Sequence, residues 1–228
     1  MNIKQGQALR NNINSLINTG EYEDAYKQAK KLLREAEKKH WQELIIFALS
    51  IQMAFLIESD NLDEADKLST KMAKQPTTGY GLFLQARLFL KQKKMKKALE
   101  MGQEALTFAN THKDTSPQEI YEKIYNLLGI LYSNYGYHQQ ALDCDWQAME
   151  TAVTLDLKAT NYSNYLFNLH FLHNSPEQYY AAHVGYNDLF RDFVWFKHTD
   201  KYKLESIKKR QASLYSLGAT TLGCWKSL

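Results

Sequence analysis

The chain has 228 residues, of which 44% are hydrophobic and 23% are charged, and its formal net charge is +3. So small and mixed a charge is not typical of proteins that bind nucleic acid or membrane surfaces, so we expect neither as a partner. The ten glycines and three prolines are few for this length and argue against an all-β fold and against disorder. The mean hydropathy of −0.52 is too low for the run of about 20 apolar residues that a spanning helix needs.

The N-terminal stretch and the cysteines indicate a compartment. The opening residues, MNIKQGQALRNN, lack the apolar segment of a secretory signal peptide. The only cysteines are Cys144 and Cys224, which are too few for a framework of disulfides. We therefore expect a protein of the reducing cytoplasm.

Four short stretches of the sequence resemble one another. Each has a turn, then a helix start, then an alanine; the turns begin at Gly20, Asp60, Lys93 and Gly136, and the alanines are Ala25, Ala65, Ala98 and Ala141. An apolar helical pattern precedes each turn, so each unit is predicted to be a helical hairpin. The step from Ala65 to Ala98 is close to the tetratricopeptide period of about 34 residues, and the other steps need only longer connections.

The fourth stretch carries the fullest motif. Its spaced residues are Tyr125, Leu128, Gly129, Tyr132, Gly136, Ala141 and Ala148. This pattern resembles the tetratricopeptide consensus. A small residue at Gly129 lets the first helix of the hairpin approach the second, Ala141 is expected where the crossing is tightest, and Tyr132 fills the remaining gap. The predicted fold is all-α: a right-handed superhelical solenoid of about four to five tetratricopeptide-like helical hairpins.

The periodicity and the capping residues predict ten helices. Their ranges are 3–18, 22–39, 41–58, 62–74, 78–92, 95–110, 117–134, 138–154, 158–173 and 176–192. Ser116 and Ser175 each precede a proline and are expected to cap the helices that follow, while Pro76 falls where the second repeat should end. Five lysines between residues 91 and 97 are interpreted as a solvated turn rather than a phosphate site.

The segment 161–183 is interpreted as a degenerate fifth hairpin. Residues 115–196 resemble the last repeats of bacterial proteins similar to O-linked N-acetylglucosamine transferases, and the matching residues are Ser163, Asn164, Leu166, Leu169, Pro176, Glu177 and His183. Tyr165 stands where that family often has leucine. The resemblance implies that a nucleotide-sugar-binding domain should follow, but the sequence after residue 196 contains no counterpart of its opening strand.

Two regions are therefore predicted: residues 1–196 as the helical repeat domain, and residues 197–228 as a C-terminal cap or a truncated or out-of-frame tail. The last 18 residues contain a single charged residue, Lys226, and no helical stripe. A cap would cover the last hairpin, as solenoids require. Both interpretations of the tail stay open.

No motif of an enzyme is present. There is no phosphate-binding loop, dinucleotide fingerprint or nucleophile elbow. His170 and His173 would share one helix but have no third metal ligand at useful spacing, and Cys144 is interpreted as a small core residue. Asp143 and Asp145 point to different sides of their helix and form no acid–base pair. We therefore expect a protein without catalysis, cofactor or metal.

The first helices of the hairpins are expected to line a concave groove. The groove residues predicted to bind a peptide are Arg10, Asn14, Phe47, Tyr80, Phe83, Arg87, Lys91, Asn126 and Asn134. Asparagine and arginine can hold a peptide backbone or a carboxylate, while aromatic rings supply sequence-tolerant contact area. Phe47, Tyr80 and Phe83 would be the anchors.

Two families offer comparisons for this groove. Arg10 and Asn14 resemble the first half of the carboxylate clamp of heat-shock co-chaperones, although Tyr80 stands where that clamp needs a polar residue. Asn11 matches the asparagine ladder of the glycosyltransferase repeats, and Asn126 lies one place away from it. The leading hypothesis is a non-enzymatic module that binds a peptide or helix of a protein partner. The alternative is the acceptor-recognition region of a bacterial protein glycosyltransferase whose catalytic domain is missing or separate.

Overall fold

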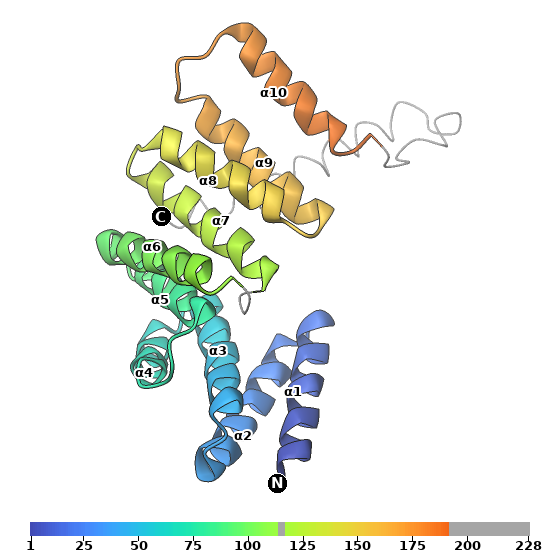
Figure 1. Cartoon of the computed structure of the whole chain (residues 1–228), viewed down its shortest axis with the longest axis vertical. Coiled ribbons are helices and arrows are strands. Elements are labelled where there is room, and N and C mark those ends of the chain that lie inside the picture. Colours follow the sequence, from blue (N-terminus) through green and yellow to red (C-terminus); the bar gives the residue numbers. More distant parts are fainter. Residues whose placement is uncertain (114–116, 192–228) are drawn as a thin grey trace, which may run out of the picture. The chain divides into compact units, whose positions relative to one another are not determined.

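The computed structural model describes residues 1–113 and 117–191, and within these ranges the chain folds into ten α-helices and no strand (Figure 1). The helices are α1 (Ile3–Asn18), α2 (Tyr22–Lys39), α3 (Gln42–Glu58), α4 (Leu62–Met72), α5 (Gly79–Lys91), α6 (Met95–Thr111), α7 (Gln118–Asn134), α8 (His138–Thr151), α9 (Leu155–Leu169) and α10 (Pro176–Asp188). Met1–Leu189 forms one compact unit, and Phe190–Leu228 is assigned to a second. The predicted tail, 197–228, lies outside the described residues.

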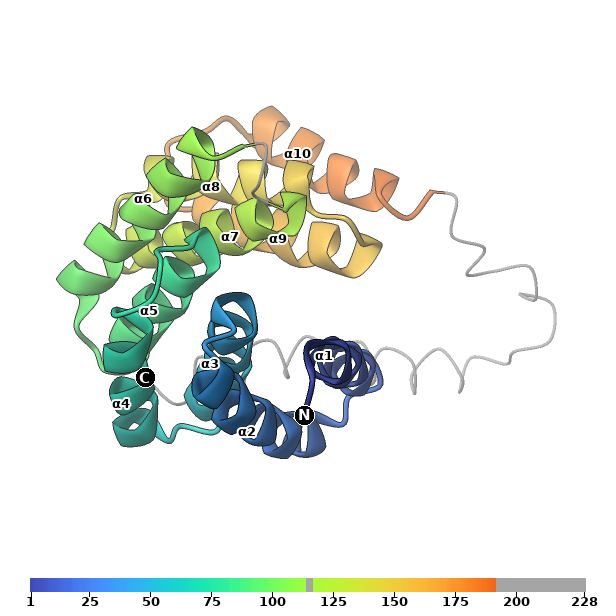
Figure 2. The same ribbon diagram turned by 60° about the horizontal axis from the view of Figure 1, so that its bottom comes forward.

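The helices pair as five successive hairpins, α1–α2 to α9–α10. The backbone of each odd-numbered helix also lies close to that of the next odd-numbered helix, whereas the described even-numbered helices show no such close approach of their backbones. Side chains do join α2 to α4, since Lys71 forms an ion pair with Glu37 at 3.7 Å. Figure 2 shows the odd-numbered helices α3, α5, α7 and α9 following one another along one side of the stack. This arrangement confirms the predicted all-α solenoid of helical hairpins.

The first four hairpins turn through the same three-residue connection. Its middle residue has a positive φ in every case: 82° at Gly20, 54° at Asp60, 58° at Lys93 and 76° at Gly136. The residue after it donates its N–H to the carbonyl five positions earlier, and its own carbonyl accepts the N–H of the recurring alanine in the following helix. At the fourth turn, Tyr137 donates to the carbonyl of Tyr132 and accepts from the N–H of Ala141. The left-handed residue therefore satisfies the last carbonyls of one helix and starts the next.

The four predicted alanines are buried where the two helices of each hairpin pack together. Ala25, Ala65, Ala98 and Ala141 are all buried, each in the first turn of an even-numbered helix. Gly129 of α7 also faces this crossing, since a Cβ there would lie 3.6 Å from the Ala141 carbonyl oxygen. The prediction that small residues allow the close approach of the two helices is confirmed.

One continuous apolar core runs from Ile13 in α1 to Leu131 in α7. Tyr162, Leu166 and Leu169 of α9 form a second, smaller cluster. No residue of α10 is buried, so α10 contributes less to the apolar core than the other helices do. No described helix is both long and apolar enough to span a membrane.

The helix termini differ from the predicted ones mainly at α9. This helix begins at Leu155, because Thr154 caps it by accepting the N–H of Leu157 at 3.3 Å. It ends at Leu169, so the prediction that His170 and His173 share one helix is wrong: His170 is the C-cap and His173 lies in the following loop.

The two predicted serine caps have different outcomes. Ser175 accepts the N–H of Gln178, whose side chain accepts the N–H of Ser175, and Pro176 is the first helical residue. This confirms the predicted cap of α10. Ser116 lies outside the described residues.

Substitutions at two of these turns should change the free energy of unfolding in opposite directions. Lys93→Gly should stabilise the fold by about 1 kcal/mol, because a residue with a Cβ is strained in the left-handed region. Gly136→Ala should destabilise it by a similar amount. The exposed helical residue Lys97 provides a control, since Lys97→Gly should cost about 1 kcal/mol. Urea denaturation measures all three, and a loss of stability in Lys93→Gly would contradict the described turn.

The crossing of α7 and α8 yields a second stability prediction. Ala141→Phe should destabilise the protein by about 1–3 kcal/mol, because a buried site in contact with a neighbouring backbone cannot accept a ring. Ala181 is an exposed alanine of α10, so Ala181→Phe should leave the urea midpoint almost unchanged. Equal midpoints for Ala141→Phe and the wild type would exclude a tight crossing at this position.

Candidate peptide-binding face

All nine predicted binding residues lie on odd-numbered helices. Arg10 and Asn14 are on α1, Phe47 on α3, Tyr80, Phe83, Arg87 and Lys91 on α5, and Asn126 and Asn134 on α7. Because consecutive odd-numbered helices are neighbours, these positions form a series across the stack. We call this surface the odd-helix face.

The side chains of α1 and α3 meet through a cation–π contact. The guanidinium carbon of Arg10 lies 5.0 Å from the centre of the Phe47 ring, and both residues are half-buried. Asn14, one turn further along α1, is exposed. Arg10 and Phe47 therefore form a joint surface in which a flat cation covers an aromatic ring.

Ion pairs join α5 to the end of α3. Arg87 pairs with Glu58, and the ammonium of Lys91 lies 3.1 Å from a carboxylate oxygen of Asp60. Both pairs are largely exposed, so they contribute little to stability. They do neutralise Arg87 and Lys91, two of the three cations that were predicted to face a peptide.

The two aromatic residues of α5 differ in exposure. The ring centres of Tyr80 and Phe83 are 5.7 Å apart, and Arg87 lies 5.6 Å from the Phe83 ring centre. Phe83 is only 6% exposed and belongs to the main core. Tyr80 is half-buried, and burial raises the pKa of its hydroxyl. Of these two predicted anchors, Tyr80 is therefore the more accessible.

The amides of α7 are also engaged. Asn126 donates to Asn161 of α9 at 2.6 Å, and Asn161 in turn donates to Glu122 of α7 at 2.9 Å. Asn134 is exposed and donates to the carbonyl of Ile130 within its own helix. Asn126 thus connects two neighbouring helices, while Asn134 is open to solvent.

Several of the predicted residues contact a side chain on, or just after, a neighbouring odd-numbered helix. Arg10 contacts Phe47, Arg87 and Lys91 contact acids at the end of α3, and Asn126 contacts α9. No single contact joins all nine. The polar side chains therefore connect the helices laterally as well as offering groups to a ligand.

Sequence reasoning missed a buried polar group at the contact of α8 and α9. Asp145 is 1% exposed, and its Oδ2 accepts from Asn168 at 2.7 Å, while the Oδ1 of Asn168 lies 3.1 Å from Nδ1 of His138. Burial raises the pKa of Asp145 to about 7, and the bond from Asn168 opposes that rise. The seven-residue spacing of Asn161 and Asn168 was the available signal, since it places both amides on one helix face.

Two exposed aromatic residues at the end of α9 were also missed as surface features. Phe167 is 46% exposed and Phe171 is 55% exposed, and their rings pack edge to face with centres 5.1 Å apart. The Phe171 ring also stacks on His138 at 4.3 Å. They extend the aromatic surface of the odd-numbered helices to α9.

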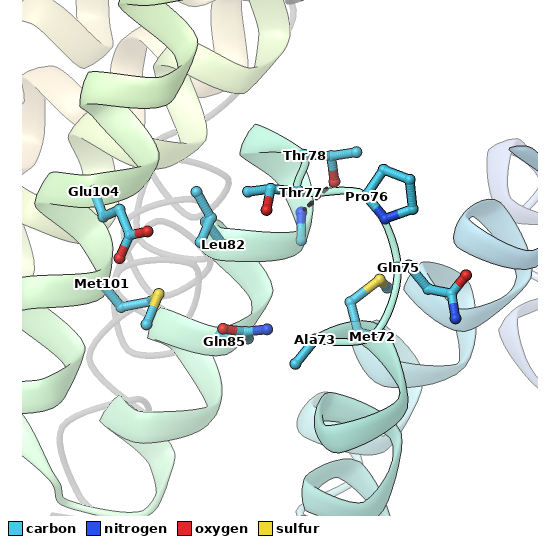
Figure 3. Close-up of a pocket in the computed structure, with 11 residues that line it drawn as sticks. Met72, Ala73, Gln75, Pro76, Thr77, Thr78, Leu82, Gln85, Met101 and Glu104 are labelled. Carbon is cyan, nitrogen blue, oxygen red and sulfur yellow. Dashed lines mark hydrogen bonds between the residues drawn. The ribbon is translucent and has the colours of Figure 1, made fainter. Parts of the chain in front are cut away.

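A shallow cavity of about 180 Å³ lies where the connection from α4 to α5 meets α6 (Figure 3). Met72 and Pro76 line one side of it and Met101 and Glu104 of α6 line the other. The N-cap Thr78 accepts the N–H of Gly81 at 3.0 Å beside it. None of the nine predicted binding residues lines this cavity. Within the described residues no cluster of three or more metal-ligating side chains occurs.

Comparisons with known proteins bear on the fold. No family model matches the chain, and no curated protein matches it. A solved structure titled "MamA RS-1 ArsTM double mutant" aligns with a TM-score of 0.55 at 16% identity, over 82% of this chain and 94% of that one. Another, BtubC from P. vanneervenii, aligns with a TM-score of 0.45 at 14% identity, over 74% and 83%. MamA is a tetratricopeptide-repeat protein, so the fold is a tetratricopeptide-like helical repeat.

The contact between Gly129 and Asp145 can be tested with a double-mutant cycle. A Cβ at Gly129 would clash with Oδ1 of Asp145, so Gly129→Ala should destabilise the protein by about 1–3 kcal/mol. In an Asp145→Ala background the clash is removed, and the same substitution should cost clearly less. Urea denaturation of the four proteins gives the coupling. Strictly additive effects would show that the two residues do not meet.

Proposed function

We propose that this protein is a non-enzymatic interaction module whose odd-helix face binds an extended peptide or a helix of a protein partner. The tetratricopeptide-like fold supports the class, since helical repeats of this kind present long surfaces to other proteins. The observation that carries the proposal is the series of accessible aromatic and amide side chains on consecutive odd-numbered helices. They are Asn14, Phe47, Tyr80, Asn134 and Phe167.

Each kind of side chain has its own part in this binding mode. Asparagine side chains both donate and accept, so they pair with the backbone of a peptide whatever its sequence. Phe47 and Tyr80 give apolar contact area at little cost in side-chain entropy. Phe83 supports Tyr80 from within the core.

The ion pairs of α5 add a requirement on the ligand. A carboxylate that reaches Arg87 or Lys91 must compete with Glu58 or Asp60. Arg10 has no such competitor among the described residues, because it covers Phe47 instead. An acidic group of the peptide is therefore expected to bind first at the α1–α3 end of the face.

The glycosyltransferase alternative gains no support from the comparisons, since neither named structure is titled as a transferase. No described residue favours a catalytic role. We therefore advance a single function.

Peptides selected on the purified protein by phage display test the proposal. The double variant Phe47→Ala/Tyr80→Ala should bind a selected peptide at least about tenfold more weakly, because buried aromatic anchors carry much of such binding energy. Isothermal titration calorimetry measures the affinity, and circular dichroism confirms that the variant is folded.

Tyr22 provides the matched control. It is an exposed tyrosine at the start of the even-numbered helix α2, so Tyr22→Ala should leave the affinity unchanged. The proposal fails if the selected peptides bind the double variant as tightly as the wild type, and loss of binding in Tyr22→Ala would place the site on the even-numbered helices.

A further inference from the structure

Two buried hydrogen bonds connect α9 to the preceding hairpin, and in each a side-chain amide of α9 donates to a carboxylate. Asn161 and Asn168 are seven residues apart and therefore share one face of α9. Asn161 donates to Glu122 of α7 at 2.9 Å, and Asn168 donates to Asp145 of α8 at 2.7 Å. Each amide thus bonds a carboxylate on a different helix of the preceding hairpin.

These carboxylates lack the cations that usually accompany buried acids. Glu122 is 6% exposed and Asp145 is 1% exposed, and within the described residues neither forms an ion pair with lysine or arginine. Burying a charged group without a cation is costly unless hydrogen bonds satisfy it. Asp145 is the less satisfied of the two, because its Oδ1 is buried without a hydrogen-bond partner.

The geometry suits the protonated form of Asp145. A proton on Oδ1 removes the buried charge and leaves the bond from Asn168 to Oδ2 intact. Gly129 faces Oδ1 and has no side chain to bond it. In agreement with this, burial raises the pKa of Asp145 to about 7.

Asn168 connects the acid to a histidine. Since its NH₂ group donates to Asp145, its Oδ1 must accept, so Nδ1 of His138 carries the hydrogen of the 3.1 Å bond. His138 can make this bond as a neutral ring or as a cation. The ring also stacks on Phe171, just beyond the end of α9.

Within the described residues, a few other ionisable groups besides His138 lie around Asp145. On α8 these are Asp143, which is exposed, and Cys144, whose pKa burial raises to about 12. Tyr125 of α7 and Tyr165 of α9 lie nearby, and burial raises the pKa of both hydroxyls. Among these groups, Asp145 is the one whose pKa burial brings to about 7.

We propose that Asp145, Asn168 and His138 form a pH-sensitive latch that fixes α9 to α8. The latch holds when Asp145 takes up a proton and loosens when Asp145 releases it. Because α9 carries Phe167 and Phe171 and supports α10 through the bond from the Tyr162 hydroxyl to Ala182, loosening changes the last hairpin as a whole. The inference stands independently of peptide binding.

The sign of the pH effect follows from linkage. The pKa of Asp145 is raised in the folded state, so its stabilising effect is fully present below the ordinary aspartate value of about 3.9 and is lost as the pH rises through about 7. Between pH 6 and pH 8, opening of α9 should become about tenfold more favourable. Most proteins with paired carboxylates show the opposite trend.

Amide hydrogen exchange of the whole protein tests the latch. Rates for peptides within 155–169, corrected for the intrinsic pH dependence of exchange, should show about tenfold less protection at pH 8 than at pH 6. Peptides within 42–58, from α3, should show no such change. In Asp145→Asn the pH dependence should disappear, whereas in Asp143→Asn, two residues away and exposed, it should remain.

His138 requires its own variant. His138→Gln keeps a donor near Asn168 but removes the ionisable ring, so the pH dependence should persist if Asp145 is the sensor. Loss of the dependence in His138→Gln but not in Asp145→Asn would assign it to the histidine and overturn the proposal.

A direct titration keeps the proposal testable if Asp145→Asn does not fold. Carboxyl ¹³C NMR of the wild type should show one aspartate with a midpoint near 7, assigned to Asp145. The proposal is wrong if every aspartate titrates below about 5, or if α9 protection is the same at both pH values.

Discussion

The close approach of the two helices within each hairpin is the constraint on which this structure depends. The two helices of a hairpin pack so closely that the first turn of the even-numbered helix carries a buried alanine, as at Ala98 in α6 and Ala141 in α8. The three-residue turn sets the same distance each time by bonding that alanine to the residue before the helix. Once each hairpin is closed in this way, its remaining apolar surface can be buried only against another hairpin.

Every neighbouring pair of hairpins has contacts in which an odd-numbered helix takes part, and the side-chain contacts between hairpins are chemically varied. A cation lies over a ring between α1 and α3, ion pairs join α3 to α5, and amides join α7 to α9. The side chains that define the candidate binding face therefore also set the spacing of the helices. A ligand that bound these side chains as proposed would also change the contacts between neighbouring repeats, so binding and stacking would be coupled through the same residues.

The sequence was sufficient for the hairpins because their signals are local. The alanines, the turns and the cap at Ser175 each lie within a few residues of the structure that they specify. The polar network was not predictable, because Asn168 and Asp145 are 23 residues apart in the chain and only the packing of α9 on α8 brings them together. Phe83 was predicted as a surface anchor, but α5 buries all four residues from Gly81 to Leu84, so its faces cannot be separated by periodicity alone. The binding of a peptide stays a prediction.

The wider spacing of the described even-numbered helices, compared with the odd-numbered ones, has a mechanical consequence. The backbones of the described even-numbered helices do not approach one another closely, and the ion pair between Lys71 of α4 and Glu37 of α2 is largely exposed. A small rotation of one hairpin against the next can therefore change the spacing of the even-numbered helices at little cost in free energy. Bending between repeats is therefore expected to be easier on the side of the even-numbered helices than on the side of the odd-numbered helices. A tensile load on the protein would accordingly be absorbed by bending between repeats before any single hairpin opens.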